Sequence, residues 1–102
     1  PRQLVRLLHV MANDSQFGSL FMSALPESGT DGTLSGRMKS PDLVHHIHAK
    51  TGSFQGVSTL SGYMTTKTGK SLVFSILINH IVGNRDQSHT LQSQIASVFY
   101  QL

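Results

Sequence analysis

Apolar residues near the amino terminus recur at the spacing of an amphipathic helix. The first set lies between residues 2 and 11: Leu4, Leu7, Leu8 and Met11. The second set follows Asn13-Asp14-Ser15, which can end one helix and cap the next: Phe17, Leu20, Phe21 and Ala24. Pro26 ends the second helix, so the spacing predicts a helical hairpin over residues 1–25 with both apolar stripes in the core.

Three later segments have the composition of strands and are joined by short connections. They span residues 43–52, 57–66 and 71–79. Because short connections join neighbouring antiparallel strands, the three segments predict an antiparallel meander over residues 43–79. The third segment is nearly all apolar, and we expect it to be buried on both faces.

Two further segments complete the pattern. Residues 26–42 are rich in Gly, Ser, Thr and Asp and predict a long loop, which in a compact domain usually has a function or covers another element. Residues 86–101 predict a closing helix that begins near Asp86 or Ser88. The apolar face of this helix would pack on the sheet and consists of Leu91, Ile95, Val98 and Phe99. The predicted class is α+β, in a single partial domain over residues 1–102.

Length and charge limit the possible function classes. The 102 residues suffice for one small domain or a piece of a larger one, and the start at Pro1 instead of a methionine indicates a processed product or a fragment. Cysteine is absent, which excludes disulfides and thiolate chemistry. The net charge is +3, but the eight basic residues are scattered, so nucleic-acid binding is disfavoured. No apolar run reaches the roughly 18 residues of a membrane-spanning helix.

The candidate chemistry centres on residues 48–53, His-Ala-Lys-Thr-Gly-Ser. Period-2 alternation along the predicted strand places His46, His48 and Lys50 on one side. A lysine charge, a threonine hydroxyl and a glycine that lets another backbone approach form, on a strand, a site for a carboxylate. Lys50-Thr51-Gly52 is also the third signature of the penicillin-binding proteins and serine β-lactamases.

A second copy of the tripeptide is Lys67-Thr68-Gly69. It lies in a polar, glycine-containing segment between two strand-like runs, which is typical of a hairpin tip, so we assign no catalytic role to Lys67. The segment Gly69-Lys70-Ser71 is similar to the end of a phosphate-binding loop. However, Met64 stands where that loop requires its first glycine, so the pattern fails.

An ordered set of further motifs surrounds the first Lys-Thr-Gly. The set consists of Leu25-Pro26, Gly29-Thr30-Asp31-Gly32-Thr33-Leu34, Arg37-Met38, His48-Ala49-Lys50-Thr51-Gly52-Ser53, Gly56-Val57-Ser58, Leu60-Ser61-Gly62-Tyr63 and Phe74-Ser75-Ile76-Leu77-Ile78-Asn79. In this order, over residues 4–100, it resembles the C-terminal part of the D-alanyl-D-alanine carboxypeptidase/endopeptidase family, the class C low-molecular-mass penicillin-binding proteins. The resemblance implies the C-terminal half of a penicilloyl-serine transferase fold, with the active site between the Lys-Thr-Gly strand and a helical region.

Two motifs that such enzymes need are missing from the chain. No serine is followed three residues later by lysine, and no serine precedes an asparagine by two residues. Ser-x-x-Lys supplies the nucleophile and its base, and both missing motifs lie N-terminal to Lys-Thr-Gly in the family. We therefore expect a C-terminal fragment that is inactive alone, with the nucleophile serine in the N-terminal remainder of the same protein.

The resemblance also implies roles for the residues that are present. Lys50 attracts the terminal carboxylate of the substrate, and Thr51 donates a hydrogen bond to that carboxylate. Gly52 permits close passage of the substrate backbone, and His48 lines the approach to the cleft. The backbone N–H of Ser53 is an oxyanion-hole donor, so Lys50 and Ser53 are the predicted catalytic residues.

A metal site is the alternative use of the histidines. His46 and His48 lie two residues apart on the predicted strand, but no Cys, Asp or Glu except Asp42 stands beside them in sequence. We therefore expect no metal here, and surface positions for His45 and His46. The resemblance implies that the parent enzyme needs no organic cofactor. Asp31 and Thr33, in the Gly-Thr-Asp-Gly-Thr-Leu loop, are expected to fix that loop.

The resulting hypothesis is a fragment of a serine-type D-Ala-D-Ala carboxypeptidase/endopeptidase. The parent would cleave peptidoglycan peptides ending in D-Ala-D-Ala through an acyl-enzyme and would be acylated by β-lactams. It would act outside the cytoplasmic membrane, in the periplasm of a Gram-negative source. One alternative is a non-catalytic peptidoglycan- or carboxylate-binding module, which an upstream sequence without Ser-x-x-Lys would favour. The other is a β-lactamase-like hydrolase, against which the Gly-Thr-Asp-Gly-Thr-Leu loop argues.

Overall fold

The computed structural model describes all of residues 1–102 and contains three α-helices, one short 3-10 helix and a three-stranded sheet. The elements are, in chain order, α1 (Arg2–Ala12), α2 (Gly18–Ala24), η1 (Gly32–Leu34), β1 (Ile47–Phe54), β2 (Val57–Thr65), β3 (Ser71–Ile78) and α3 (Arg85–Tyr100). The sheet is antiparallel with the order β1-β2-β3. The predicted α+β class, helical hairpin, three-stranded meander and closing helix are confirmed. The expected burial of their apolar stripes is wrong in part: Leu4, Leu7, Phe17 and Leu20 of the hairpin segment and Leu91 and Val98 of α3 are exposed. The buried residues of α3 are instead Ser88, Gln92 and Ala96. No helix is long and apolar enough to span a bilayer.

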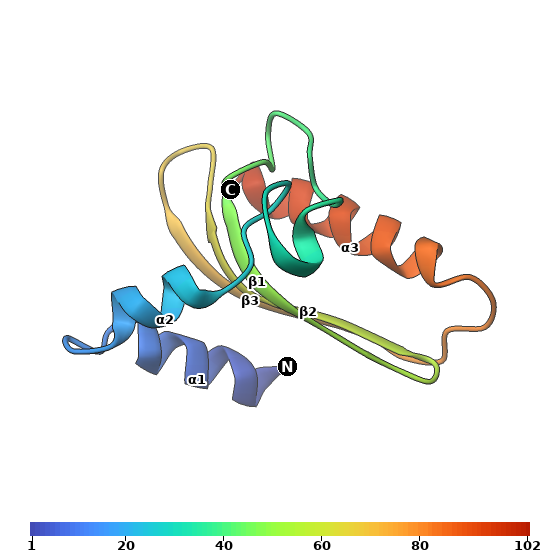
Figure 1. Cartoon of the computed structure of the whole chain (residues 1–102), viewed down its shortest axis with the longest axis horizontal. Coiled ribbons are helices and arrows are strands. Elements are labelled where there is room, and N and C mark those ends of the chain that lie inside the picture. The colour runs from blue at the N-terminus through green and yellow to red at the C-terminus, as the bar shows by residue number, and fades with distance from the viewer.

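The helices lie on opposite faces of the sheet. Figure 1 shows α3 above the strands and the α1–α2 hairpin below them. The buried cluster on the α3 side includes Ile47, Leu60 and Phe74, one from each strand, because alternate residues of a strand point to the same face. On the other face the Tyr63 hydroxyl donates a hydrogen bond to the Leu8 carbonyl of α1 at 2.6 Å. The sheet is therefore sandwiched over part of its length.

The third strand is buried on one face only, so the expectation of two buried faces is wrong. Phe74 and Ile76 of β3 are buried against the α3 side. Leu77, on the opposite face, is 42 % exposed. The reason is that α1 lies near the start of β3, where Leu72 and Val73 line a hollow with residues of α1, and leaves the end of the strand uncovered.

The first strand begins later than residue 43, and this corrects the predicted grouping of the histidines. Residues 43–46 form a turn, in which His45 has a left-handed φ of 65°. Because alternation starts only at Ile47, His46 does not share a side with His48. Its ring packs against Tyr100 of α3, with ring centroids 5.2 Å apart.

The start of α3 differs from the predicted bound by one residue. The helix begins at Arg85, its N-cap is Asn84, and Asp86 lies in its first turn, near the start as expected. The Asn84 side-chain oxygen accepts a hydrogen bond from the Asp86 backbone N–H at 2.9 Å. Asparagine is favoured as an N-cap because its short side chain reaches the free N–H groups of the first turn.

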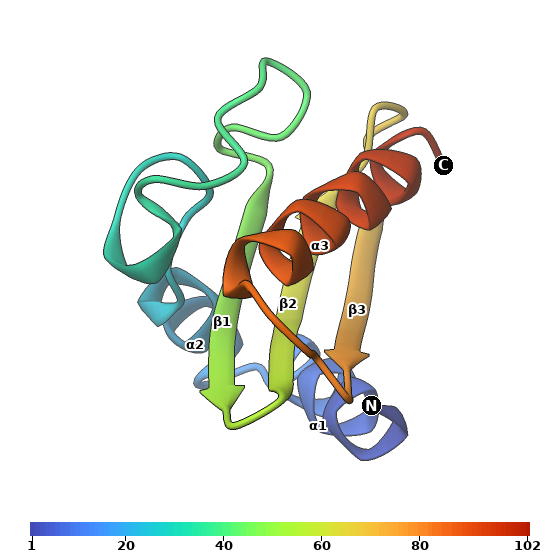
Figure 2. The ribbon, with the colours of Figure 1, turned by 90° about the vertical axis from the view of Figure 1, so that its right-hand side faces the viewer.

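The long loop covers the outer edge of β1, on the side away from β2 (Figure 2). Its first residues pair with the strand: the Ser28 N–H donates to the Ile47 carbonyl at 2.9 Å, and the Ala49 N–H donates to the Pro26 carbonyl at 3.0 Å. The Asp31 carboxylate accepts a hydrogen bond from the Glu27 N–H at 2.6 Å, which confirms its role in fixing the loop. The loop extends to residue 46 because residues 43–46 are not yet strand.

The second Lys-Thr-Gly copy forms the turn between β2 and β3, as predicted. Gly69 has a φ of +82°, a conformation that residues with a Cβ rarely adopt. The Lys67 N–H donates to the Tyr100 carbonyl at 2.8 Å, so the turn is fixed to the end of α3. The strand register places this turn near the start of β1. Lys50-Thr51-Gly52 lies further along β1, toward the end of that strand.

Candidate active site

The Lys-Thr-Gly strand is an edge strand with one partner. β1 pairs with β2 in a register that places Lys50 opposite Ser61 and Ser53 opposite Ser58. The loop residues that cover its outer edge reach only as far as Ala49, through the bond to the Pro26 carbonyl. Beyond Ala49, the outer edge of β1 has no strand beside it.

Two backbone N–H groups of β1 are directed to this open edge. The Ile47 carbonyl and the Ala49 N–H point away from β2, since both bond to the loop. Backbone groups of alternate residues in a strand point the same way, so the N–H groups of Thr51 and Ser53 also point outward. The predicted oxyanion-hole donor is thus located on the unpaired edge.

Lys50 is exposed, and its side chain folds against the backbone of the next residue. Its Nζ donates a hydrogen bond to the Thr51 carbonyl at 2.9 Å. Because the Thr51 carbonyl points to the outer edge, the ammonium group lies at that edge too. The ion pairs of the chain all involve Glu27 and histidines, so no carboxylate neutralises Lys50.

Thr51 contacts a residue outside its own strand. Its hydroxyl donates to the Thr33 hydroxyl at 3.0 Å, and Thr33 belongs to η1. Thr33 was expected only to fix the loop, and no sequence signal connected it to the Lys-Thr-Gly strand. The structure brings the two threonines together because η1 lies against the outer side of β1.

Gly52 has a close neighbour within the sheet. A Cβ at this position would lie 2.5 Å from the Thr59 hydroxyl oxygen, and that hydroxyl donates to the Gly52 carbonyl at 3.3 Å. The missing side chain therefore makes room for Thr59 of the adjacent strand. The prediction that Gly52 lets a substrate backbone pass concerns the outer edge of β1, and it stays a prediction.

His48 approaches a carboxylate that sequence reasoning missed. Its Nε2 lies 3.5 Å from Glu27 Oε1, and Glu27 Oε2 lies 2.9 Å from His45 Nδ1. The hydrogen bond with His45, followed by one with Thr30, holds the pKa of Glu27 below its ordinary value. The only sequence signal was the position of Glu27 beside Pro26, at the start of the loop that pairs with β1.

The histidines and carboxylates do not assemble a metal centre. No group of three or more His, Asp or Glu side chains has the arrangement needed to hold an ion. His46 lies against Tyr100 on the α3 side, so it does not converge with His48.

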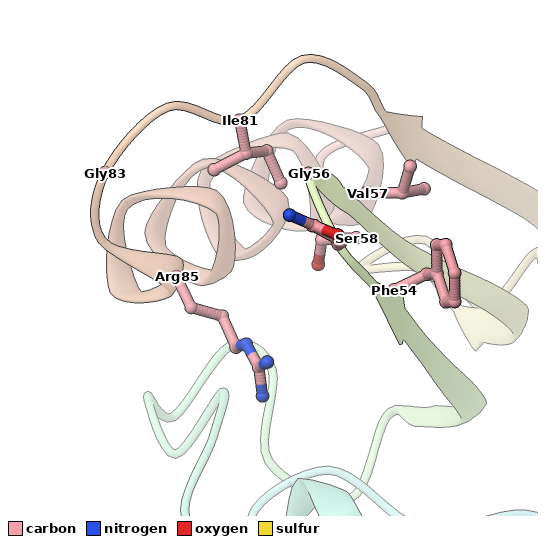
Figure 3. A pocket seen from close by; sticks show the side chains of 8 residues that line it. Phe54, Gly56, Val57, Ser58, Ile81, Gly83 and Arg85 are labelled. Atoms are coloured by element: carbon pink, nitrogen blue, oxygen red, sulfur yellow. The ribbon is translucent and has the colours of Figure 1, made fainter.

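A small hollow of about 140 Å³ lies just past Ser53, at the turn between β1 and β2. In Figure 3, Phe54 comes from the end of β1, Gly56 from the turn and Ser58 from β2. Ile81 comes from the segment before α3, and Arg85 is the first residue of α3. The Phe54 side chain is 81 % exposed. The hollow combines apolar surface with one cation, Arg85.

Comparison with known proteins matches this arrangement to penicillin-binding proteins. The chain is 40 % identical over 81 residues to the D-alanyl-D-alanine carboxypeptidase DacB of Haemophilus influenzae, which covers 78 % of this chain and 17 % of DacB. It is 36 % identical over 73 residues to the D-alanyl-D-alanine carboxypeptidase of Actinomadura sp. strain R39, covering 67 % of this chain and 13 % of that protein.

The structural comparison agrees with the sequence comparison. Penicillin-binding protein 4 (dacB) from Haemophilus influenzae superposes with a TM-score of 0.85 and 32 % identity, over 100 % of this chain and 24 % of that protein. The same protein in complex with a β-lactam also matches with a TM-score of 0.85. The chain thus spans a quarter or less of the length of these relatives and has the fold of the C-terminal part of penicillin-binding protein 4. All of residues 1–102 match one family description, and the chain belongs to the D-Ala-D-Ala carboxypeptidase 3 (S13) family.

Proposed function

We propose that residues 1–102 form the substrate-binding edge of a serine-type D-Ala-D-Ala carboxypeptidase/endopeptidase. The parent enzyme would cleave peptidoglycan peptides through an acyl-enzyme, and β-lactams would acylate it. Family membership and the β-lactam complex of the similar Haemophilus influenzae protein support this proposal.

One observation carries the proposal. Beyond Ala49 the outer edge of β1 has no partner strand, and the Lys50 ammonium lies at the same edge as the outward N–H groups of Thr51 and Ser53. An extended peptide can add to such an edge as a further strand, with main-chain hydrogen bonds to alternate residues. A cation at that edge selects a peptide that ends in a carboxylate.

The proposed chemistry assigns one task to each group. Lys50 attracts the terminal carboxylate, and the Thr51 hydroxyl donates a hydrogen bond to it. The Ser53 N–H donates to the oxygen that becomes negative when the nucleophile attacks the scissile carbonyl. One donor of this kind typically raises the rate by about 10²–10³. His48, paired with Glu27, lines the approach to the edge.

The nucleophile of the proposed reaction is a serine outside this chain. No Ser-x-x-Lys or Ser-x-Asn motif occurs within residues 1–102. The serine would attack the peptide carbonyl, expel the leaving amine and be released by water, without a metal or organic cofactor. A β-lactam would acylate the same serine by ring opening, with its nitrogen still attached to the acyl group. Because the substrate is cell-wall peptidoglycan, we place the reaction outside the cytoplasmic membrane, in the periplasm of a Gram-negative source.

Covalent labelling of the longer protein that contains this chain tests the proposal. We expect a fluorescent penicillin to label that protein stoichiometrically, and peptide mapping to locate the label on a serine outside residues 1–102. Prior incubation with unlabelled penicillin should abolish the signal. A folded longer protein that takes up no label would show that the carboxylate-binding edge serves a non-catalytic module.

A further inference from the structure

We propose that Thr33 is a positioning residue for carboxylate binding, acting through the hydroxyl of Thr51. This inference rests on the proposed function, in which Thr51 donates to the carboxylate of the substrate. It assigns Thr33 a task at the site in addition to the loop-fixing role expected from the sequence.

The geometry places the two hydroxyl groups in direct contact. Thr51 Oγ1 and Thr33 Oγ1 are 3.0 Å apart, and the Thr51 proton is directed toward Thr33. Thr51 is half-buried, whereas Thr33 is exposed at the outer edge of β1. The contact is the only side-chain hydrogen bond between η1 and the strand.

The hydrogen-bonding capacity of a hydroxyl explains what this contact can do. Each threonine hydroxyl has one proton and two lone pairs. When Thr51 donates its proton to a carboxylate, its oxygen becomes free to accept, and the proton of Thr33 can turn toward it. The resulting chain runs from Thr33 to Thr51 to the carboxylate, and consecutive hydrogen bonds of this kind strengthen one another.

Three contacts hold η1 in place independently of the Thr33 hydroxyl. Asp31 accepts the Glu27 N–H at 2.6 Å on one side of η1. Leu34 is 0 % exposed and belongs to the core. Arg37 Nη2 donates to Gln92 Oε1 of α3 at 2.8 Å. Because the loop is anchored by these groups, removal of the Thr33 hydroxyl should leave its position unchanged.

The test compares substrates with and without the carboxylate in the longer protein. Second-order acylation rate constants are measured for a β-lactam free acid and its methyl ester, with wild type, Thr33→Val, Thr33→Ser and Thr51→Val. We expect Thr33→Val to slow acylation by the acid about three- to tenfold, the range of one net hydrogen bond. It should leave the ester within about twofold, because the ester lacks the charged acceptor. Thr33→Ser should restore the acid rate.

A double variant and a matched control test whether Thr33 acts through Thr51. Thr33→Val combined with Thr51→Val should be no slower than Thr51→Val alone, because Thr33 acts only through Thr51. Thr68→Val, in the second Lys-Thr-Gly copy, should change neither rate. The melting temperature of Thr33→Val should match that of wild type.

Two results would overturn the inference. Equal slowing of acid and ester by Thr33→Val, or a lowered melting temperature, would assign Thr33 a purely structural role. An unchanged acid rate in Thr33→Val, with slowing in Thr51→Val, would also overturn it while the proposed function stands. If the wild type is acylated by neither compound, the proposed function fails first and the inference fails with it.

Discussion

Glu27 and His45 are joined across the start of β1 by a 2.9 Å contact between Oε2 and Nδ1. The other carboxylate oxygen of Glu27 lies 3.5 Å from Nε2 of His48, within β1 itself. One acidic side chain therefore connects the two ends of the long loop to the strand that carries Lys-Thr-Gly. The stabilisation that this contact gives to the edge of β1 therefore depends on pH.

The sign of that dependence follows from the pKa of Glu27. The hydrogen bond with His45, and then that with Thr30, lowers the pKa from its ordinary value of 4.5. A carboxyl group with a lowered folded-state pKa stabilises the fold above its unfolded pKa, and this contribution disappears as the pH falls through the folded value. We expect the melting temperature of wild type to fall more steeply than that of Glu27→Gln below about pH 4.5.

Thermal unfolding across the acid range checks this expectation. Asp42→Asn is a suitable control, because Asp42 is an exposed acid of the same loop without a hydrogen-bond or ion-pair partner. Its acid profile should follow that of wild type. Parallel profiles for wild type and Glu27→Gln would contradict the proposed contribution of the Glu27–His45 contact.

The two Lys-Thr-Gly copies should differ sharply in their effect on acylation. Lys50 Nζ lies at the open edge of β1, whereas Lys67 lies in the turn fixed to the end of α3. A charge-assisted hydrogen bond contributes about 1.5–3 kcal/mol, so we expect Lys50→Ala to slow acylation of the longer protein at least ten- to hundredfold. Lys67→Ala should change the rate little. Equal slowing by the two substitutions would mean that the wrong copy has been assigned to the site.

The strands were predictable because their signals are local. The segment expected at residues 57–66 is β2 at Val57–Thr65, and that expected at 71–79 is β3 at Ser71–Ile78. The turn that contains Gly69 marks the end of β2 and the start of β3, and the short connection makes the two strands antiparallel. The start of β1 was not predictable in the same way, since its apolar and histidine pattern continues back into the turn at residues 43–46.

The candidate site was predictable only where its residues are contiguous. Lys50, Thr51 and Ser53 form one motif, and the structure locates them on one edge. Glu27 and Thr33 could not be associated with that edge from sequence, because the loop that carries them reaches β1 through tertiary contacts. A side chain that acts at a distance in sequence leaves no periodic signal.

A buried polar relay at α3 gives a stability prediction. Gln92 is 0 % exposed, accepts from Arg37 at 2.8 Å and donates to Ser58 at 3.0 Å. Gln92→Leu preserves the approximate volume but removes both bonds: Ser58 loses its side-chain donor, and Arg37 Nη2 keeps only the 3.5 Å bond to the His89 carbonyl. An unsatisfied buried group costs about 1–3 kcal/mol, and we expect the free energy of unfolding to fall by at least that amount.

Urea unfolding measures this loss. The matched control is Gln94→Leu, because Gln94 lies two residues along the same helix and is exposed. The control should lie within about 0.5 kcal/mol of wild type. If Gln92→Leu is as stable as Gln94→Leu, the relay from the loop to β2 contributes nothing to the fold.

Gly62 of β2 determines how closely the Lys-Thr-Gly strand can approach. It pairs with Ala49 of β1, and a Cβ at position 62 would lie 2.5 Å from the Ala49 Cα and 2.7 Å from its Cβ, and closer still to the His48 carbonyl oxygen. Since these are mainly backbone atoms, the strands would have to separate. We expect Gly62→Ala to lower the free energy of unfolding by about 1–3 kcal/mol.

The displacement should also reach the site, because β1 carries Lys50 and Ser53 a few residues beyond Ala49. Acylation of the longer protein by penicillin should therefore slow in Gly62→Ala under conditions where the protein remains folded. Gly36→Ala is the control, because no atom lies within 4 Å of a Cβ at that position. An acylation rate for Gly62→Ala equal to that of Gly36→Ala would show that the position of β1 tolerates the wider spacing, and that the catalytic geometry depends on contacts from elsewhere in the parent enzyme.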